Sequence, residues 1–183
     1  CLLLALTTAI GVRALLVALP NEVLLDIVVG AVLTVLSYSS LAIVLLTATL
    51  AASGMVPATV ALGLVLGANI GSGVLALLAT ANAAPLARRL PLGNLIFKAS
   101  GALIAIPLLP YIHPWLQNLV GEVHQQVVLF HLVFNLALAA LFVGFTGPVG
   151  RLMDRWLAEP DTARGDRPRH LDPVALATPT LAI

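Results

Sequence analysis

Cysteine and charge are both scarce in this chain, and each scarcity excludes a class of protein. Cys1 is the only cysteine among 183 residues, so an internal disulfide framework and a thiolate metal site are excluded. Only 9% of residues are charged and the net charge is +1, so the chain lacks the basic surface that binds nucleic acid. Because 60% of residues are hydrophobic, the chain also lacks the polar residues that cover a soluble domain of this length.

Long apolar runs with almost no charge take the place of the missing polar surface. They predict an all-α integral membrane protein whose main partner is the lipid bilayer. The alternating polarity of a membrane-spanning β-barrel is not seen in this sequence. The chain starts with Cys1 directly inside an apolar run, and we expect it to be a fragment of a longer protein.

The apolar segments predict a membrane domain over 1–157, followed by a polar, proline-rich linker over 158–183. The expected elements are helices at 1–19, 56–81, 92–112 and 127–147, with a longer apolar run at 23–52. Pro57 is well placed for the first turn of the helix at 56–81.

The cationic residues predict the orientation of these segments. Arg88 and Arg89 in an expected loop at 82–91 are separated by two spans from Arg151 and Arg155, so both pairs should lie on one side. The positive-inside rule makes that side cytoplasmic. The expected loop at 113–126 has no Lys or Arg and is predicted to be external.

A cluster of hydroxyl groups stands in the middle of the run at 23–52, in the stretch TVLSYSSLAIVLL. As one helix this run would be ~45 Å long, which exceeds a hydrocarbon core of ~30 Å. A re-entrant helical hairpin that breaks at the cluster fits better, with its second leg starting near Ser40 and capped by Ser39 or Ser40. Free amides and the helix dipole at such a tip favour an anion. The alternative is one unbroken helix whose serines bond to their own carbonyl groups.

Small residues form a second motif at 67–72, GANIGS. Gly63, Gly67 and Gly71 recur every four residues and predict close helix packing. Asn69 in this segment either binds a hard cation such as sodium through its carbonyl oxygen or bridges two helices through its amide. The candidates for a cation site or a helix break are Ser37, Gly67, Asn69, Gly71 and Ser72.

The two motifs together carry a family resemblance. YSSLA at 38–42, GANIGS at 67–72, ARR at 87–89, Phe97 and HLVFN at 131–135 resemble the type II sodium/phosphate cotransporter family. That family repeats QSSSA and GANIGT motifs in two inverted halves, and this chain is similar to the second half over roughly 23–157. The tail segments RPRHLD and TPTLA resemble the junction to a PhoU-like cytoplasmic domain in one bacterial branch.

The resemblance implies a secondary transporter, not an enzyme, in a bacterial cytoplasmic membrane. It would move inorganic phosphate by alternating access, with sodium as the coupling ion and no other cofactor, together with the missing N-terminal repeat. The resemblance places phosphate at Ser39 and Ser40, and at Tyr38 where the family has glutamine. Leu41 stands in place of the family's third serine.

Lys98 is an unusual residue for the middle of an apolar span. NLIFK at 94–98 follows the pattern of HLVFN at 131–135, so Lys98 corresponds to Asn135. An ammonium at that depth costs roughly 2.5–3.5 kcal/mol on insertion scales. We expect Lys98 either to replace a bound cation or face phosphate, or to reach toward the Arg88 side of the membrane.

We expect three further ionisable residues to have structural roles. Glu22 and Asp26 are expected to be solvated at the membrane boundary, and His131 to hydrogen-bond between helices. Two other functions stay open from sequence: a non-transporting structural or regulatory subunit, and an intramembrane serine hydrolase. The hydrolase would pair Ser39 or Ser40 with Lys98 or His131 as the base.

Overall fold

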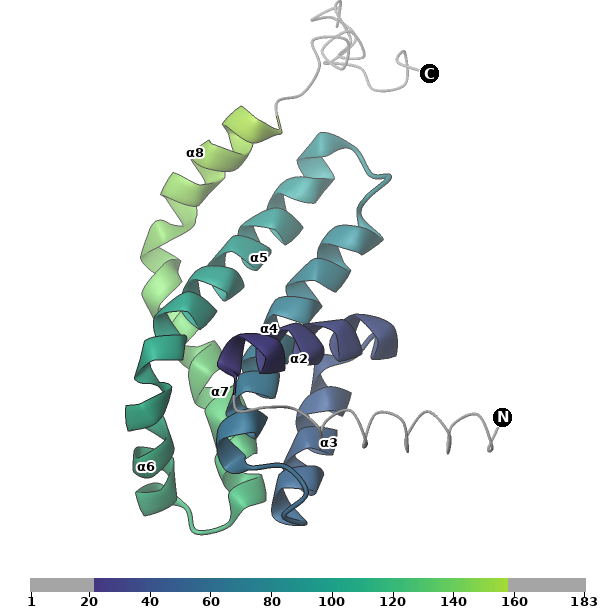
Figure 1. Cartoon of the computed structure of the whole chain (residues 1–183). Coiled ribbons are helices and arrows are strands. Elements are labelled where there is room, and N and C mark those ends of the chain that lie inside the picture. The colour runs from purple at the N-terminus through teal and green to yellow at the C-terminus, as the bar shows by residue number, and fades with distance from the viewer. Residues whose placement is uncertain (1–21, 158–183) are drawn as a thin grey trace, which may run out of the picture.

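The computed structural model describes residues 22–157, and within this range the chain is helical and contains no strand. The elements follow one another through short turns (Figure 1). They are α2 (Val23–Ser37), α3 (Ser40–Ala52), α4 (Ala58–Ala79), α5 (Pro85–Ala105), η1 (Ile106–Leu108), α6 (Leu109–Leu119), α7 (Val123–Phe142), η2 (Val143–Phe145) and α8 (Thr146–Trp156). The helix expected at 1–19 and the linker expected at 158–183 lie outside the described residues.

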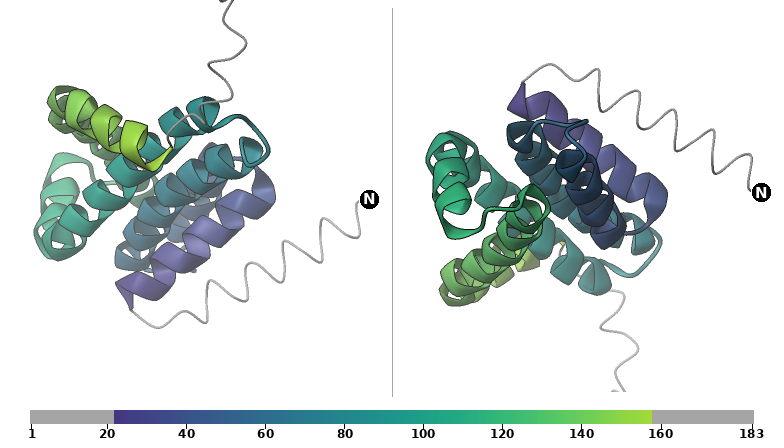
Figure 2. Two further views of the ribbon diagram at one scale, coloured as in Figure 1. Left: turned by 90° about the horizontal axis from the view of Figure 1, so that it is seen from above. Right: turned by 90° about the horizontal axis from the view of Figure 1, so that it is seen from below.

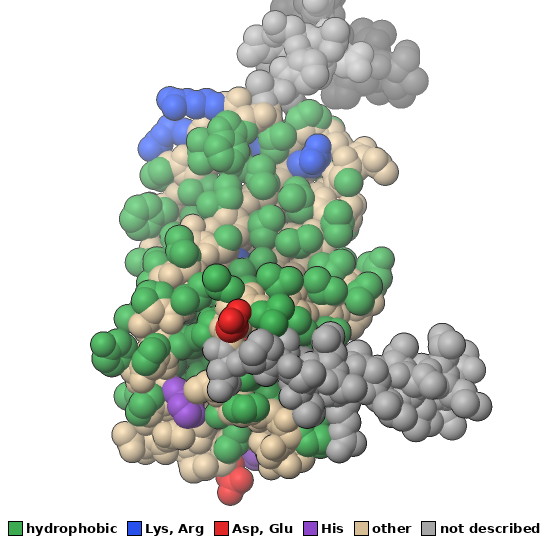
Figure 3. All heavy atoms as spheres, in the orientation of Figure 1, with side chains coloured by type: hydrophobic (Ala, Val, Ile, Leu, Met, Phe, Trp, Pro, Cys, Tyr) green, Lys and Arg blue, Asp and Glu red, His purple; other side chains and the backbone are tan. Residues whose placement is uncertain are grey.

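The helices fall into two length classes. Three stretches are long and apolar enough to cross a membrane: Ala58–Ala79, Pro85–Leu119 and Val123–Trp156. α2 and α3 have 15 and 13 residues, which at 1.5 Å per residue gives only ~20 Å each. The surface is dominated by hydrophobic side chains (Figure 3), as a protein surrounded by lipid requires. The described part of the chain is therefore all-helical and has the composition of a membrane protein.

α4 is the central helix of the described fold. Its residues from Val60 to Asn69 are all buried, because α2, α3, α5 and α7 pack around it. A helix that is apolar on every face can be stable only in such a surrounded position. Seen end-on, α2 lies on one side of α4, with α6 and α8 on the other (Figure 2).

Proline and glycine shape the two longest helical stretches. Pro107 has no N–H to continue the α5 ladder, and the chain passes through the 3₁₀ turn η1 into α6. The second bend, η2 between α7 and α8, contains Gly144 and is followed by Pro148. Both bends divide stretches that are too long to cross a bilayer as straight helices.

The structure differs from the sequence prediction at two of the expected loops. The segments 82–91 and 113–126 contain prolines and were expected to be irregular, but α5 starts at Pro85 and α6 extends to Leu119. Of the prolines in these segments, Pro85 stands in the first turn of α5, where the missing N–H removes no hydrogen bond, whereas Pro91 and Pro114 lie inside α5 and α6. The spans expected at 92–112 and 127–147 are therefore longer, and Arg88 and Arg89 lie on α5.

The start of α5 is tied to the end of α8. Arg89 Nη1 is 2.6 Å from Asp154 Oδ1, and its Nε and Nη2 donate to the carbonyl oxygen of Leu157 at 3.1 and 2.7 Å. Lys and Arg side chains gather mainly at this end of the visible face (Figure 3). Arg89 and the α8 arginines therefore share one end of the fold, as the charge pattern predicts.

Candidate functional site

The apolar run at 23–52 is broken at Tyr38 and Ser39. Tyr38 has left-handed backbone angles, φ 55° and ψ 20°, and Ser39 is extended, with φ −152° and ψ 111°. α3 consequently turns away from the line of α2 (Figure 1). The predicted break is confirmed, and the alternative of one unbroken helix is wrong.

The start of α3 presents backbone amides at this break. Ser39 is the N-cap, as expected, and its Oγ accepts a hydrogen bond from Ala42 N at 3.2 Å. Ile43 N bonds to the Ser39 carbonyl oxygen at 3.4 Å. The amides of Ser40 and Leu41 precede the intrahelical ladder and have no partner within the helix, so they remain as donors at its positive end.

The hydroxyl groups of the cluster have different surroundings. Ser37 Oγ lies within hydrogen-bond distance of the carbonyl oxygens of Thr34 (3.3 Å) and Ser39 (3.2 Å), which holds the turn together. Ser40 is half-buried at the first position of α3. Tyr38 is 78% exposed within the described part of the chain. Ser39 and Ser40 are thus the hydroxyls beside the free amides.

A second polar cluster joins α4, α5 and α7. Asn69 Nδ2 donates to the Val65 carbonyl oxygen at 3.0 Å and lies 3.3 Å from His131 Nδ1. Asn135 Nδ2 donates to the His131 carbonyl oxygen at 2.7 Å and is 3.4 Å from the same ring nitrogen. His131 therefore bridges helices, as the sequence predicts.

Lys98 joins this cluster through Ser72. Lys98 Nζ donates to Ser72 Oγ at 2.6 Å, and Ser72 Oγ donates to the main-chain carbonyl oxygen of Asn69 at 2.7 Å. The Lys98 ammonium is therefore held by α4, and the expectation that the side chain reaches toward the Arg88 side stays a prediction. The candidates Asn69, Ser72 and Lys98, which are distant in sequence, are brought together in one chain of hydrogen bonds.

The glycine ridge of α4 packs directly against α2. A Cβ on Gly67 would collide with the carbonyl oxygen of Ile27, and one on Gly71 would lie 2.6 Å from the carbonyl oxygen of Ala31. α4 is continuous through this segment, so no helix break occurs at Gly67, Asn69, Gly71 or Ser72. Of the five candidates for a cation site or break, only Ser37 lies at the break. Gly67 and Gly71 act in helix packing.

The same ridge connects the break to the polar cluster. Gly71 contacts Thr34 of α2, which is one helical turn before the break, and Gly71 is the neighbour of Ser72. Thr34 is fully buried, and its Oγ1 has no hydrogen-bond partner in the described part of the chain. The hydroxyls of the break and those of α4 therefore belong to one region of the fold.

A hollow with polar walls borders this cluster between α5 and the bend after α7. It has a volume of about 340 Å³, and its lining includes Asn94, Lys98, Asn135 and Thr146. A second hollow of about 410 Å³ shares Asn94 and Thr146 and extends to Arg89 and Asp154. The two hollows together reach from the Arg89 end of the fold to the Lys98 side chain.

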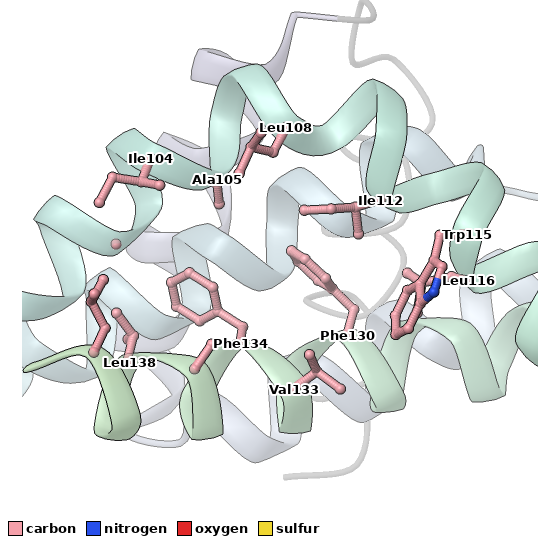
Figure 4. A pocket seen from close by; sticks show the side chains of 13 residues that line it. Ile104, Ala105, Leu108, Ile112, Trp115, Leu116, Phe130, Val133, Phe134 and Leu138 are labelled. Carbon is pink, nitrogen blue, oxygen red and sulfur yellow. The ribbon is translucent and has the colours of Figure 1, made fainter.

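A third hollow is apolar and has a different character. It lies between α5–α6 and α7, and Phe130, Phe134, Ile112 and Trp115 are among its walls (Figure 4). Its volume is about 190 Å³ and its lining is made of glycine and hydrophobic residues. An anion or a metal cation has no polar partner there, so this hollow is not a candidate for ion binding.

Asp26 is a correction to the sequence prediction. We expected a solvated carboxylate, but Asp26 is 1% exposed and packs against Gly63 of α4. Its Oδ1 has no hydrogen-bond partner among residues 22–157. The available signal was spacing: Asp26, Gly30 and Thr34 repeat every four residues, as Gly63, Gly67 and Gly71 do. Matching ridges on two helices indicate a shared face.

Comparison with known proteins gives a consistent result. The family model for the Na+/Pi-cotransporter matches residues 4–109. A protein of Salmonella typhimurium named "Putative inorganic phosphate export protein YjbB" is 43% identical over 183 residues, which cover 97% of this chain and 33% of that protein. The protein of the same name from Escherichia coli K12 is 42% identical over 179 residues, with the same coverage.

A more distant relative and the solved structures complete the comparison. The "Uncharacterized protein YqeW" of Bacillus subtilis is 27% identical over 127 residues, which cover 69% of this chain and 41% of that protein. No solved structure gives a significant match. The chain spans about a third of the length of the YjbB proteins that it matches.

Proposed function

The chain belongs to the Na+/Pi-cotransporter family, and from this premise we propose that it is one repeat of a secondary phosphate transporter. The transporter would sit in a bacterial cytoplasmic membrane and move inorganic phosphate by alternating access, coupled to a sodium gradient. The names of the YjbB relatives, which refer to phosphate export, support the substrate. The missing N-terminal repeat would supply the other half of the site.

The break between α2 and α3 is the observation that carries this proposal. Its open amides on Ser40 and Leu41 and its hydroxyls on Ser39 and Ser40 form a donor-rich, uncharged surface at the positive end of a helix. Phosphate needs several donors, and backbone amides supply them without side-chain flexibility. We assign Tyr38 to the same site, where its phenol would meet phosphate or the other repeat.

The short lengths of α2 and α3 support a re-entrant hairpin. Neither helix can cross a hydrocarbon core of ~30 Å, so we propose that both enter and leave from one side and that the break lies at depth. Irregular backbone at that depth is stable only inside protein or beside a water-filled cavity. The contact of α2 with the buried helix α4 provides the protein surroundings.

The polar cluster on α4, α5 and α7 is proposed as the cation position of this repeat. Ser72 Oγ and the main-chain carbonyl oxygen of Asn69, to which it donates, are oxygen atoms of the kind that hard cations prefer. Asn135 lines the adjoining hollow with Lys98. A position for positive charge close to the proposed phosphate site would offset the charge of the anion as it crosses the membrane.

The length of the relatives leaves space for further domains. Because the chain spans about a third of the YjbB proteins, a first repeat and a PhoU-like cytoplasmic domain can both be accommodated. We propose that residues 158–183 lead toward that domain.

The geometry favours a transporter over an intramembrane hydrolase. Ser39 Oγ accepts a bond from Ala42 N, whereas Lys98 bonds to Ser72 and His131 lies beside Asn69 and Asn135. Neither possible base contacts Ser39 or Ser40, as a serine nucleophile would require. A purely structural or regulatory subunit remains the second candidate, because replacement of the family glutamine by Tyr38 is compatible with lost transport.

Flux of labelled phosphate tests the proposal. The full-length protein, reconstituted in proteoliposomes, should exchange ³²P-phosphate across the membrane and respond to a sodium gradient. Ser39→Ala combined with Ser40→Ala should abolish the flux, whereas Ser53→Ala should preserve it, because Ser53 Oγ bonds only to the Leu50 carbonyl at the far end of α3. No flux in either direction would favour the structural subunit, and labelling of Ser39 by a fluorophosphonate probe would favour the hydrolase.

A further inference from the structure

The ammonium group of Lys98 hydrogen-bonds to Ser72 Oγ of the GANIGS segment, and this hydroxyl in turn donates to the main-chain carbonyl oxygen of Asn69. Lys98 Nζ is 2.6 Å from Ser72 Oγ, and this hydroxyl is 2.7 Å from the carbonyl oxygen of Asn69. Lys98 lies in the middle of α5, and its side chain crosses to α4 rather than following its own helix to the end. The charge is therefore held at one place by a partner on another helix.

The surroundings of this ammonium are uncharged. Within residues 22–157 the one ion pair joins Arg89 to Asp154, so no carboxylate of the described chain neutralises Lys98. Hydroxyl and carbonyl oxygens stabilise a monovalent cation through their dipoles, whether the cation is a metal ion or an ammonium. A positive charge inside a membrane protein requires such a partner or a water-filled cavity.

A hollow borders the Lys98 side chain that bonds to Ser72. The hollow of about 340 Å³ lined by Lys98 and Asn135 joins the hollow that extends to Arg89, through the shared residues Asn94 and Thr146. A side chain shorter than lysine at position 98 would extend this hollow toward Ser72, to which the ammonium now bonds. The position is therefore suited to exchange between a tethered cation and a mobile one.

We propose that the Lys98 ammonium is a built-in cation that takes the place of a sodium ion at Ser72 and Asn69 in this repeat. The inference rests on the proposed function, since it assigns the cation position of that transporter. Sodium then binds for coupling in the N-terminal repeat alone. Each phosphate is accompanied by one sodium ion fewer, because this repeat no longer binds one. Lys98 fixes the number of coupling ions.

Counting bound sodium in the purified full-length protein tests this assignment. Lys98→Gln should bind one more ²²Na⁺ per chain than the wild type at equilibrium, because the amide leaves the oxygens free for an ion. In that variant sodium should also strengthen phosphate binding further, by roughly 5–150-fold, the usual range for coupling between two ligands. Adding Ser72→Ala to Lys98→Gln should remove the extra ion. Arg151→Gln removes an exposed cation from α8 and should leave the count at the wild-type value.

A second measurement does not depend on folding of the Lys98 variant. Ser72→Ala in the wild-type background should leave the number of bound sodium ions unchanged, since the ammonium already occupies the position. Loss of a sodium ion in this variant would overturn the inference, as would equal counts in the wild type and folded Lys98→Gln. If Lys98→Gln loses phosphate binding without gaining sodium, Lys98 contacts the anion and the inference is also wrong. Absence of phosphate flux in the wild type refutes the proposed function, a separate result from any sodium count.

Discussion

Asn69 Nδ2 and His131 Nδ1 lie 3.3 Å apart, so a side-chain hydrogen bond joins α4 to α7 inside the bundle. Asn69 is 1% exposed, and its amide has a second acceptor in the Val65 carbonyl oxygen. Because the amide nitrogen can only donate, the ring nitrogen that faces it must be the acceptor. The neutral imidazole that carries its proton on Nε2 satisfies this geometry.

The first prediction concerns this bond. Asn69→Ala and His131→Ala should each destabilise the protein, and their double mutant should show a coupling free energy of about 0.5–1.5 kcal/mol. Thermal unfolding of the full-length protein in detergent, read by circular dichroism, measures the cycle. Asn69→Ala combined with Gln117→Ala is the matched control, because Gln117 bonds to His113 on α6. The changes in unfolding free energy of these two substitutions should therefore be additive. If the changes in unfolding free energy of Asn69→Ala and His131→Ala were strictly additive, the hydrogen bond would contribute nothing to stability.

The second prediction concerns the contact between α2 and α4. Gly67→Ala should lower the free energy of unfolding by about 1–3 kcal/mol or more, because its methyl group collides with backbone atoms of Ile27 that cannot turn aside. The control is Gly150→Ala on α8, where a Cβ meets no atom within 4 Å. That change should be neutral or stabilising by up to about 1 kcal/mol, as for glycine in a helix. Equal unfolding temperatures for the two variants would contradict the close packing.

The third prediction concerns the backbone at the break. Tyr38 adopts φ 55°, a conformation that costs an L-residue with a side chain roughly 1–2 kcal/mol, and 78% of its side chain is exposed. Tyr38→Gly should therefore raise the unfolding temperature, and Tyr38→Val should lower it. Tyr38→Phe keeps the ring and the strain but removes the hydroxyl, so its phosphate KM reports the role of the phenol alone. A lower unfolding temperature for Tyr38→Gly than for Tyr38→Val would count against the left-handed turn.

The fourth prediction separates the cap of α3 from anion binding. Ser39→Ala should destabilise α3 by about 1 kcal/mol, since Ala42 N loses its acceptor. Ser39→Asp should keep the cap and the stability, because aspartate is an equally good N-cap residue. The carboxylate should nevertheless repel phosphate from the amides, so uptake of labelled phosphate should fall much further in Ser39→Asp than stability does. Normal uptake by Ser39→Asp would mean that phosphate does not bind at this helix end.

The break could be predicted from sequence because two independent arguments met at the same residues. The run at 23–52 is too long for one span, and the Ser/Tyr cluster offers a cap at its centre. The partner of Lys98 could not be predicted in this way. Ser72 and Lys98 are 26 residues apart on different helices, and only the rotation of α4 against α5 decides that they meet.

Burial of Asp26 and the lengths of α5 and α6 were missed for a common physical reason. A charged residue near the start of an apolar run is usually solvated, and a proline usually ends a helix, but the folded chain overrides both tendencies. Gly63 leaves space for Asp26 against α4, Pro85 occupies the start of α5, and Pro91 and Pro114 are accommodated inside α5 and α6. Spacing along the paired helix would have been the better signal.

The glycine face that receives α2 has a consequence for biogenesis. α2 and α3 leave the ribosome before α4 exists, yet each is too short to anchor itself as a span, and the surface on which α2 rests is completed only at Gly71. The packing of α2 against α4 can therefore form only after the chain has been synthesised past Gly71.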